Sequence, residues 1–141
     1  MAGGLIRVSG RQNVWLERML DQARSEDVGR FLARTPGGEL FISDFGFHSI
    51  GVVMHRLDRL DALALFAHDV FARGGVALVR LEPDDTDRLV RVMREFRLDY
   101  DDAYQYVAAE KHDLEIVSFD ADFDRTPRRR RTPGEILQAR P

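Results

Sequence analysis

The chain has 141 residues, 44% of them hydrophobic and 32% charged, a composition typical of one globular domain and not of a disordered chain. The net charge of −3 predicts no overall attraction to nucleic acid, and the lack of cysteine excludes disulfides and thiolate metal sites. No apolar run is long enough to cross a bilayer and no basic-then-apolar leader is found. We therefore expect a cytoplasmic protein with no membrane contact.

Short apolar runs alternate with longer stretches of helical periodicity. Strands are expected at 5–8, 40–42, 76–81 and 114–117, and helices at 13–34 (one broken helix or two), 45–57, 58–73, 83–96 and 99–112. Trp15 belongs to the apolar stripe of the first helix and is predicted to lie in the core. The alternation predicts an α/β fold, a three-layer α/β/α sandwich with a central, mainly parallel sheet. The predicted domain spans 1–124, and an Arg/Pro-rich basic tail spans 125–141.

Carboxylates flank the last predicted helix and strand. Asp99, Asp101 and Asp102 open the helix, while Asp120 and Asp122 follow the strand. Since ligands of an open α/β sheet gather beyond the carboxyl ends of its strands, we expect these acids to converge. Hard cations such as Mg²⁺ and Mn²⁺ prefer such oxygen ligands. The structural alternative is that the first group only caps the helix and the second is a solvated turn.

Two other groups of polar residues also allow alternatives. The run Arg128–Arg131 is typical of a solvated tail, and a basic tail can also hold phosphates. His55 and His68 are expected to be solvent-facing or hydrogen-bonded helix residues, because neither cysteines nor acids at zinc spacing accompany them.

Several short motifs follow one another along the chain in the same order as the motifs of a known family. They are Asn13-Val14, Ile42-Ser43, Asp102-Ala103 with Ala108-Ala109, and Ile116-Val-Ser118-Phe-Asp120-Ala-Asp122-Phe123. Over about residues 5–124 the chain resembles the PIN domain family, which includes the toxins of VapBC-type toxin–antitoxin pairs. The resemblance implies an α/β/α sandwich and a metal-dependent ribonuclease, in which acids bind Mg²⁺ or Mn²⁺ and the ions activate a water. By position, Asp102 matches the family's third acid, Asp120 its fourth, and Asp122 a commonly acidic neighbour.

The sequence departs from the family pattern at the first two acids. Arg11 stands at the first acidic position, and His48 or Ser49 at the second. A cation would then be held mainly by Asp102 and Asp120, and weakly, since Mg²⁺ accepts one or two carboxylates with water or phosphate. The positive charge of Arg11 would oppose the ion, contact an RNA phosphate, or pair with one of the two acids.

The sequence therefore supports two main hypotheses. The first is an atypical PIN ribonuclease, for which the resemblance offers the role of toxin in a toxin–antitoxin pair, with Asp102 and Asp120 as metal ligands and Asp122 as a third catalytic acid. The expected substrate-binding residues are Arg11, Asn13, Ser43, His48, Ser49 and Ser118. The second is a catalytically degenerate PIN domain that binds RNA or protein.

Partners follow from the same resemblance. We expect RNA, a small antitoxin-like protein and a second copy of the chain, since homodimers are common in the family. A third hypothesis is a domain that only binds a partner. It rests on a helix that carries more apolar residues than a single buried face requires. These residues are Phe45, Phe47, Ile50 and Met54, which form either a partner groove or core.

Overall fold

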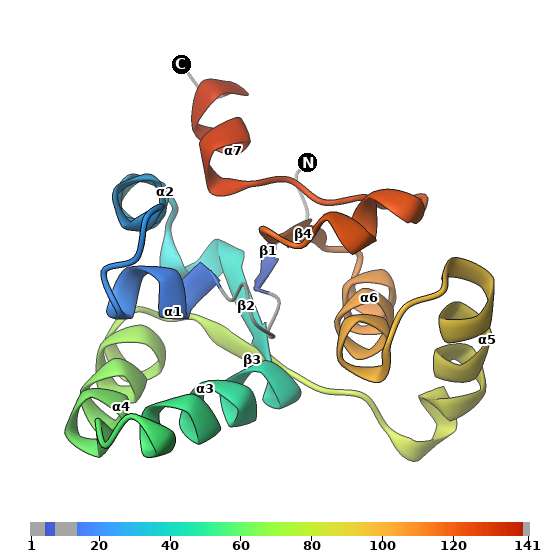
Figure 1. Ribbon diagram of the computed structural model, residues 1–141, viewed down its shortest axis with the longest axis horizontal. Helices are drawn as coiled ribbons and strands as arrows, with labels where there is room; N and C mark the ends of the chain where they lie inside the picture. Colours follow the sequence, from blue (N-terminus) through green and yellow to red (C-terminus); the bar gives the residue numbers. More distant parts are fainter. Residues whose placement is uncertain (1–4, 8–13, 140–141) are drawn as a thin grey trace.

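A parallel sheet forms the centre of the molecule. This computed structural model describes residues 5–7 and 14–139, with backbone only for the first range. Strands β1 (Leu5–Arg7), β2 (Leu40–Ser43), β3 (Ala77–Val79) and β4 (Glu115–Val117) pair in the order β3-β2-β1-β4 (Figure 1). All three strand pairs are parallel. Consequently all four strands end at the same edge, where ligand sites of such sheets form.

Helices cover both faces of this sheet (Figure 1). One face carries α1 (Val14–Met19), α2 (Ser25–Arg34), α3 (Asp44–Arg56) and α4 (Leu60–Ala67), which continues as a π-helical turn (His68–Arg73). The other face carries α5 (Thr86–Phe96) and α6 (Tyr100–His112), and α7 (Pro133–Ala139) follows at the end of the chain. Short 3₁₀ turns lie at Gly37–Glu39, Pro83–Asp85 and Ala121–Arg125. The predicted three-layer α/β/α sandwich is confirmed.

Each face of the sheet has its own hydrophobic core. Trp15, Ile50 and Met54 belong to the core beneath α1–α4, where the ring of Trp15 packs edge-on against Phe66 at 5.4 Å between centroids. The predicted core position of Trp15 is thus confirmed. Ile50 and Met54 are 0% and 1% exposed, so these two residues are core and the partner-groove alternative is wrong for them. Their burial follows from the inward stripe of α3.

The predicted helix over 13–34 is two helices. α1 ends at Met19 and α2 begins at Ser25, with Asp21 between them at a positive φ of 51°. A left-handed residue cannot continue a right-handed helix, so the chain turns here. The turn lets both helices pack on the same core.

Residues after 124 lie against the body of the protein. Arg131 pairs with Val117 as an isolated parallel bridge, and its backbone N–H donates to the carbonyl of Ile116 over 2.9 Å. α7 packs on α2 (Figure 1) and buries Ile136, which is 2% exposed. A domain boundary at 124 stays a prediction. Among the described residues, no helix has the length and apolar character needed to span a membrane.

Candidate metal centre

The first turn of α6 positions Asp102. The Asp99 carboxylate caps this helix by accepting a hydrogen bond from the Asp102 N–H over 2.9 Å. The cap satisfies one of the free N–H groups of the first turn and fixes where the helix begins. The Asp102 side chain is therefore held at the edge of the sheet, where it is only 5% exposed.

The loop after β4 brings two more acids to the same place. The Ser118 hydroxyl accepts from the Asp120 N–H, and the Asp120 carboxylate accepts from the Asp122 N–H, both over 2.9 Å. These contacts fold the chain into the 3₁₀ turn that follows, as Ser and Asp side chains commonly do in turns. One carboxylate oxygen each from Asp102, Asp120 and Asp122 lies within 4.8 Å of the others. We call these three residues the acidic centre.

The acidic centre has the donor chemistry and spacing of a site for a hard cation. Oxygens bound to Mg²⁺ at about 2.1 Å are separated by roughly 3.0 Å when adjacent and about 4.2 Å when opposite in octahedral geometry. The three carboxylate oxygens lie within 4.8 Å of one another, so small side-chain movements would bring them to these separations. The residues present therefore fit Mg²⁺ or Mn²⁺ as ligands.

The electrostatics of the acidic centre favour a bound cation. Burial, followed by the negative charges of Asp120, Asp99 and Asp122, raises the pKa of Asp102 to about 8. A buried carboxyl surrounded by like charges is destabilised in its ionised form. A cation at this point would relieve that repulsion, and strongly shifted acids are typical of functional sites.

Arg125 contacts the outer side of the acidic centre. Its Nη1 donates to Asp122 Oδ1 over 2.8 Å, while Nε and Nη2 donate to the carbonyls of Phe96 and Arg97 over 3.1 and 2.7 Å. Three contacts fix the guanidinium at the C-terminal end of α5. Sequence reasoning missed this residue, although its spacing of three from Asp122 at a turn is the signal for such a pair.

The other predicted site residues lie in different surroundings. Ser43 is fully buried; its hydroxyl donates to Gln105 Oε1 and accepts from the Gly46 N–H, both over 2.8 Å. Ser118 is also buried, 1% exposed, and holds the Asp120 loop as described. Contact of either hydroxyl with substrate stays a prediction. Gln105 was missed, and its only sequence signal is a polar side chain inside the apolar body of α6.

Of the two predicted residues on α3, one lines a separate hollow and the other does not. Exposed His48 borders it together with Asp44, Gly51 and His55, and Ser49 is half-buried on the same helix. Asp44 accepts a hydrogen bond from the Tyr104 hydroxyl over 2.7 Å and is not part of the acidic centre. Arg11 and Asn13 lie outside the described residues, so the replacement of the first acid by Arg11 stays a prediction.

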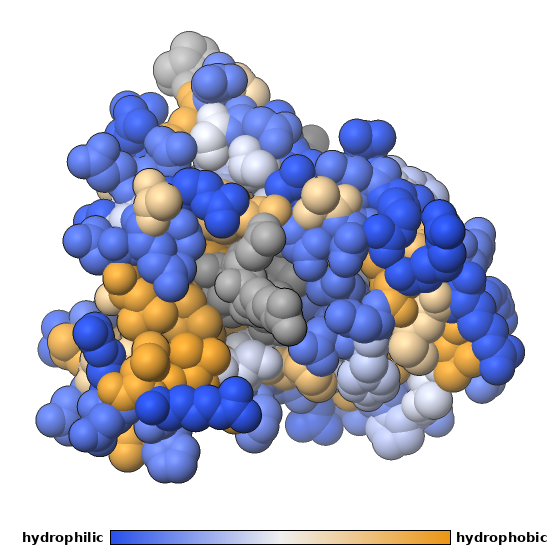
Figure 2. Space-filling view, viewed as in Figure 1, coloured by the Kyte–Doolittle hydropathy of each residue, from blue (hydrophilic) through white to orange (hydrophobic). Residues whose placement is uncertain are grey.

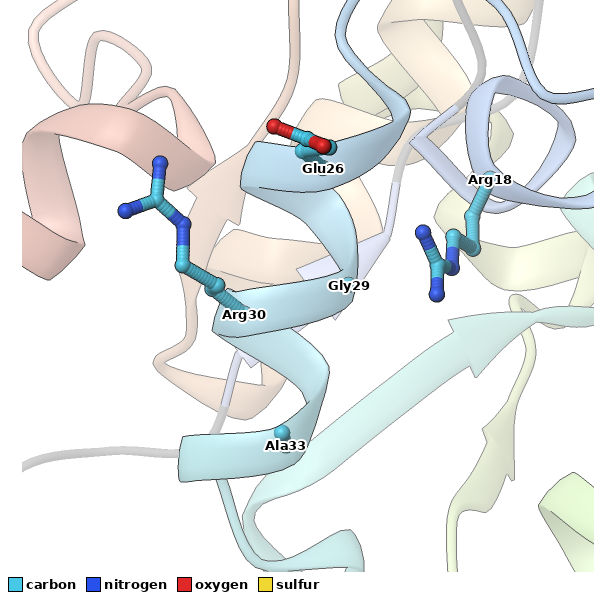
Figure 3. Close-up of a pocket in the computed structure, with 5 residues that line it drawn as sticks. All are labelled: Arg18, Glu26, Gly29, Arg30 and Ala33. Atoms are coloured by element: carbon cyan, nitrogen blue, oxygen red, sulfur yellow. The ribbon is translucent and has the colours of Figure 1, made fainter.

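A second hollow lies between α1 and α2. Figure 3 shows Arg18 reaching from α1 toward Gly29 of α2, with Glu26, Arg30 and Ala33 along the same helix. Arg18 Nη1 donates to the Ser25 carbonyl and hydroxyl over 3.2 and 3.1 Å. Its lining includes no residue of the acidic centre, so this hollow is a feature of helix packing.

Comparisons with known proteins identify the family and the fold. The PIN domain family model matches residues 12–129. No curated protein matches the chain by sequence. Three similar solved structures share the fold at low sequence identity, as follows. A toxin–antitoxin complex from Klebsiella pneumoniae has a TM-score of 0.67 and 19% identity, covering 93% of this chain and 98% of that one. VapC20 from Mycobacterium tuberculosis, described as a Sarcin-Ricin loop cleaving toxin, has a TM-score of 0.68 and 17% identity, covering 85% and 92%. A Pyrobaculum aerophilum protein has a TM-score of 0.64 and 20% identity, covering 99% and 97%.

Proposed function

Because the chain belongs to the PIN domain family, we propose that it is a divalent-metal-dependent ribonuclease and the toxin of a toxin–antitoxin pair. The observation that carries the proposal is the convergence of Asp102, Asp120 and Asp122 at the carboxyl edge of the sheet. RNA as the substrate class follows from the family resemblance, and the similar fold of VapC20, described as a Sarcin-Ricin loop cleaving toxin, supports a cleaving toxin. Cytoplasmic location and a homodimer stay predictions.

The three acids have distinct parts in this proposal. Asp102 and Asp120 would hold Mg²⁺ or Mn²⁺, and Asp122 would offer a third oxygen. A bound ion supplies activation of water and neutralisation of charge on a phosphodiester. Asp102 would release its proton when the ion binds, because metal ligands must be deprotonated. Arg125 holds Oδ1 of Asp122, which fixes that carboxylate and leaves its other oxygen for the site.

The test is manganese binding by titration calorimetry, followed by cleavage of single-stranded RNA with Mn²⁺ and with EDTA. We expect the wild-type protein to bind Mn²⁺ and cleave RNA, and Asp102→Asn to lose both by at least about 100-fold. The matched control is Asp113→Asn, which removes a carboxylate at the other end of α6, where its side chain is 92% exposed. This control is expected to bind and cleave as the wild type does.

The outcomes separate the two main hypotheses. Cleavage that persists at the wild-type rate in Asp102→Asn contradicts the assignment of the acidic centre. A wild-type protein that binds RNA but neither binds Mn²⁺ nor cleaves is the catalytically degenerate binding module. The raised pKa of Asp102 means that a cation must displace the proton which this carboxyl holds near neutral pH, whereas the binding module needs no such displacement.

An apolar hollow between α1 and α4 supports the proposal that a protein partner binds this chain. Its lining includes Trp15, Met19, Leu32 and Leu65, and Leu65 is 61% exposed. Figure 2 shows apolar side chains gathered in this part of the surface, at the lower left. Exposed apolar patches commonly mark interaction sites. We place a small antitoxin here, as an apolar segment that would cover Leu65.

Growth assays test this partner. Expression of the wild-type chain is expected to arrest growth, and co-expression of a small adjacent reading frame is expected to restore it. Leu65→Asp should keep the arrest and lose the rescue, because a carboxylate would be buried in the interface. Leu78→Asp, at a leucine on β3 that is 50% exposed, is the control and should still be rescued. Rescue of Leu65→Asp would contradict the location.

A further inference from the structure

Three aromatic rings pack together beside the acidic centre. Phe45 of α3 lies 5.9 Å from Tyr100 and 5.3 Å from Tyr104 between ring centroids, and the two tyrosines are 6.3 Å apart. All three pairs are tilted, as is common for aromatic contacts. The Tyr100 ring therefore rests on two others, yet the residue is 50% exposed. A large aromatic residue is thus held in place with half of its surface open to solvent.

Hydrogen bonds fix the inner member of this aromatic cluster. The Tyr104 hydroxyl donates to Asp44 over 2.7 Å and accepts from the Leu81 N–H over 3.0 Å. The cluster is therefore tied to α3, to the chain after β3 and to α6. Support of this kind keeps the Tyr100 ring in one orientation before any ligand arrives, which lowers the entropic cost of binding to it.

The cluster and the acidic centre share the first turn of α6. Tyr100 and Asp102 are two residues apart, which places their Cα atoms about 5.5 Å apart on opposite sides of the helix. Asp102 faces the loop after β4, while Tyr100 faces α3. The two features thus lie side by side along the carboxyl edge of the sheet. A strand of RNA held at the acidic centre would pass the aromatic cluster within a nucleotide or two.

The charges around Tyr100 select what can bind there. Asp99 and Asp101 flank it in sequence, and both are acidic. Carboxylates repel a phosphate, whereas a neutral base is indifferent to them and has a flat face for stacking. Arg80 lies nearby, directly before Leu81; its side chain is 68% exposed and pairs with Glu82 over 3.1 Å. Exposed pairs of this kind are weak, so the guanidinium is available to a phosphate.

We propose that Tyr100 is a stacking platform for an unpaired base of the RNA substrate, next to the phosphodiester held at the acidic centre, with Arg80 contacting a backbone phosphate. The inference rests on the proposed function and names the substrate class as single-stranded RNA at this edge. Stacking on aromatic side chains is a general way to bind unpaired bases. It gives affinity without demanding a particular sequence.

The test uses the wild-type chain with Ca²⁺, a cation that carboxylates also bind and that would neutralise the acidic centre, and a single-stranded oligoribonucleotide that contains 2-aminopurine. We expect binding to quench the 2-aminopurine fluorescence. Tyr100→Phe should retain the quenching and the affinity, because phenylalanine also stacks. Tyr100→Leu should lose the quenching and weaken binding about 5- to 100-fold. Leu78→Ala, at a residue also 50% exposed but on β3, is the matched control and should behave as wild type.

Further measurements distinguish a loss of base stacking from a loss of fold and from a failure of the nuclease proposal. Arg80→Gln should lower the slope of log affinity against log salt by about one, as expected for one lost phosphate contact. Tyr100→Leu should keep the wild-type melting temperature and manganese affinity, so that a loss of RNA binding is not a loss of fold. If Tyr100→Leu binds RNA and quenches as wild type does, stacking is wrong and the nuclease proposal stands. If the wild type neither binds nor cleaves RNA, both proposals fail together.

Discussion

The acidic centre and the arginine-rich segment 125–131 differ in how their charges are arranged: like charges cluster in the first, whereas charges in the second are paired with partners. In the acidic centre three carboxylates lie within 4.8 Å of one another, and one of them, Asp102, is almost fully buried. In the segment, arginines meet carboxylates and carbonyls one by one. Arg128 contacts Asp113, Arg130 contacts Asp124 and the Phe119 carbonyl, and Arg131 contacts Glu115.

The comparison distinguishes charges that serve a site from charges that serve the fold. Like charges massed in a buried place cost stability, and they are typical of sites that await an opposite charge. Paired charges tie a segment to its neighbours. The run of arginines is the more conspicuous feature of the sequence, yet three of its four members are engaged within the protein. Of this run, exposed Arg129 has the side chain best placed for an outside phosphate.

The largest effect on stability is expected for Asp102→Asn, which should raise the free energy of unfolding while it abolishes the proposed activity. Asp102→Asn removes a buried carboxyl that burial and its acidic neighbours destabilise when ionised. At pH 8.5 and without metal, we expect the free energy of unfolding to rise by about 1–2 kcal/mol. Thermal unfolding with EDTA would measure this as a rise of roughly 3–8 °C in Tm. A fall in Tm would show that Asp102 stabilises the fold, and the distinction between the acidic centre and the arginine-rich segment would be wrong.

The pH dependence of stability is the next expected effect. The pKa of Asp102 is raised from about 3.9 in the unfolded chain to about 8 in the fold. The folded state thus binds the proton more tightly, so its contribution is fully present below pH 4 and is lost as pH rises toward and through 8. Urea unfolding with EDTA should give a lower free energy at pH 8.5 than at pH 5.5.

Two controls sharpen this pH prediction. Asp102→Asn should remove most of the decrease between the two pH values. Mn²⁺ should raise Tm more at pH 8.5 than at pH 5.5, since binding displaces a proton from the site. Equal shifts at the two pH values would place the metal away from Asp102.

The sequence predicts the fold well because periodicity and turn residues carry that information locally. The acidic centre was also predictable, since Asp102 opens a helix and Asp120 and Asp122 follow a strand, and parallel strands end at one edge. Arg125, by contrast, reaches the carbonyls of Phe96 and Arg97 across 29 and 28 residues, respectively, and these two contacts leave no local pattern; only its spacing of three from Asp122 does. The aromatic cluster was missed for the same reason: Phe45 meets Tyr100 only when the helices are packed.

A smaller effect is expected in the arginine-rich segment. Arg130→Gln removes a hydrogen bond of 2.8 Å to the Phe119 carbonyl and the contact with Asp124. We expect a loss of about 1–2 kcal/mol in the free energy of unfolding, because the bond is charge-assisted and its side chain is only 20% exposed. RNA affinity should stay unchanged. Arg129→Gln, at an exposed neighbour, is the control for stability and should unfold as wild type does; a drop in RNA affinity for Arg130→Gln would make the segment part of the site.

The smallest effect is expected for Gly29→Ala, next to Arg18 of α1, whose guanidinium is hydrogen-bonded to Ser25. A Cβ added at Gly29 would lie 2.7 Å from the Arg18 guanidinium carbon, so Gly29→Ala must displace the guanidinium from Ser25 (Figure 3). The lost hydrogen bonds, worth about 0.5–1 kcal/mol, offset a gain of similar size from replacing glycine inside a helix. The net change in unfolding free energy should be near zero. In an Arg18→Met background the offset is gone, and Gly29→Ala should stabilise by about 0.5–1 kcal/mol. Equal effects in the two backgrounds would mean that this guanidinium contributes nothing to the fold, and that pairing alone does not identify a structural charge.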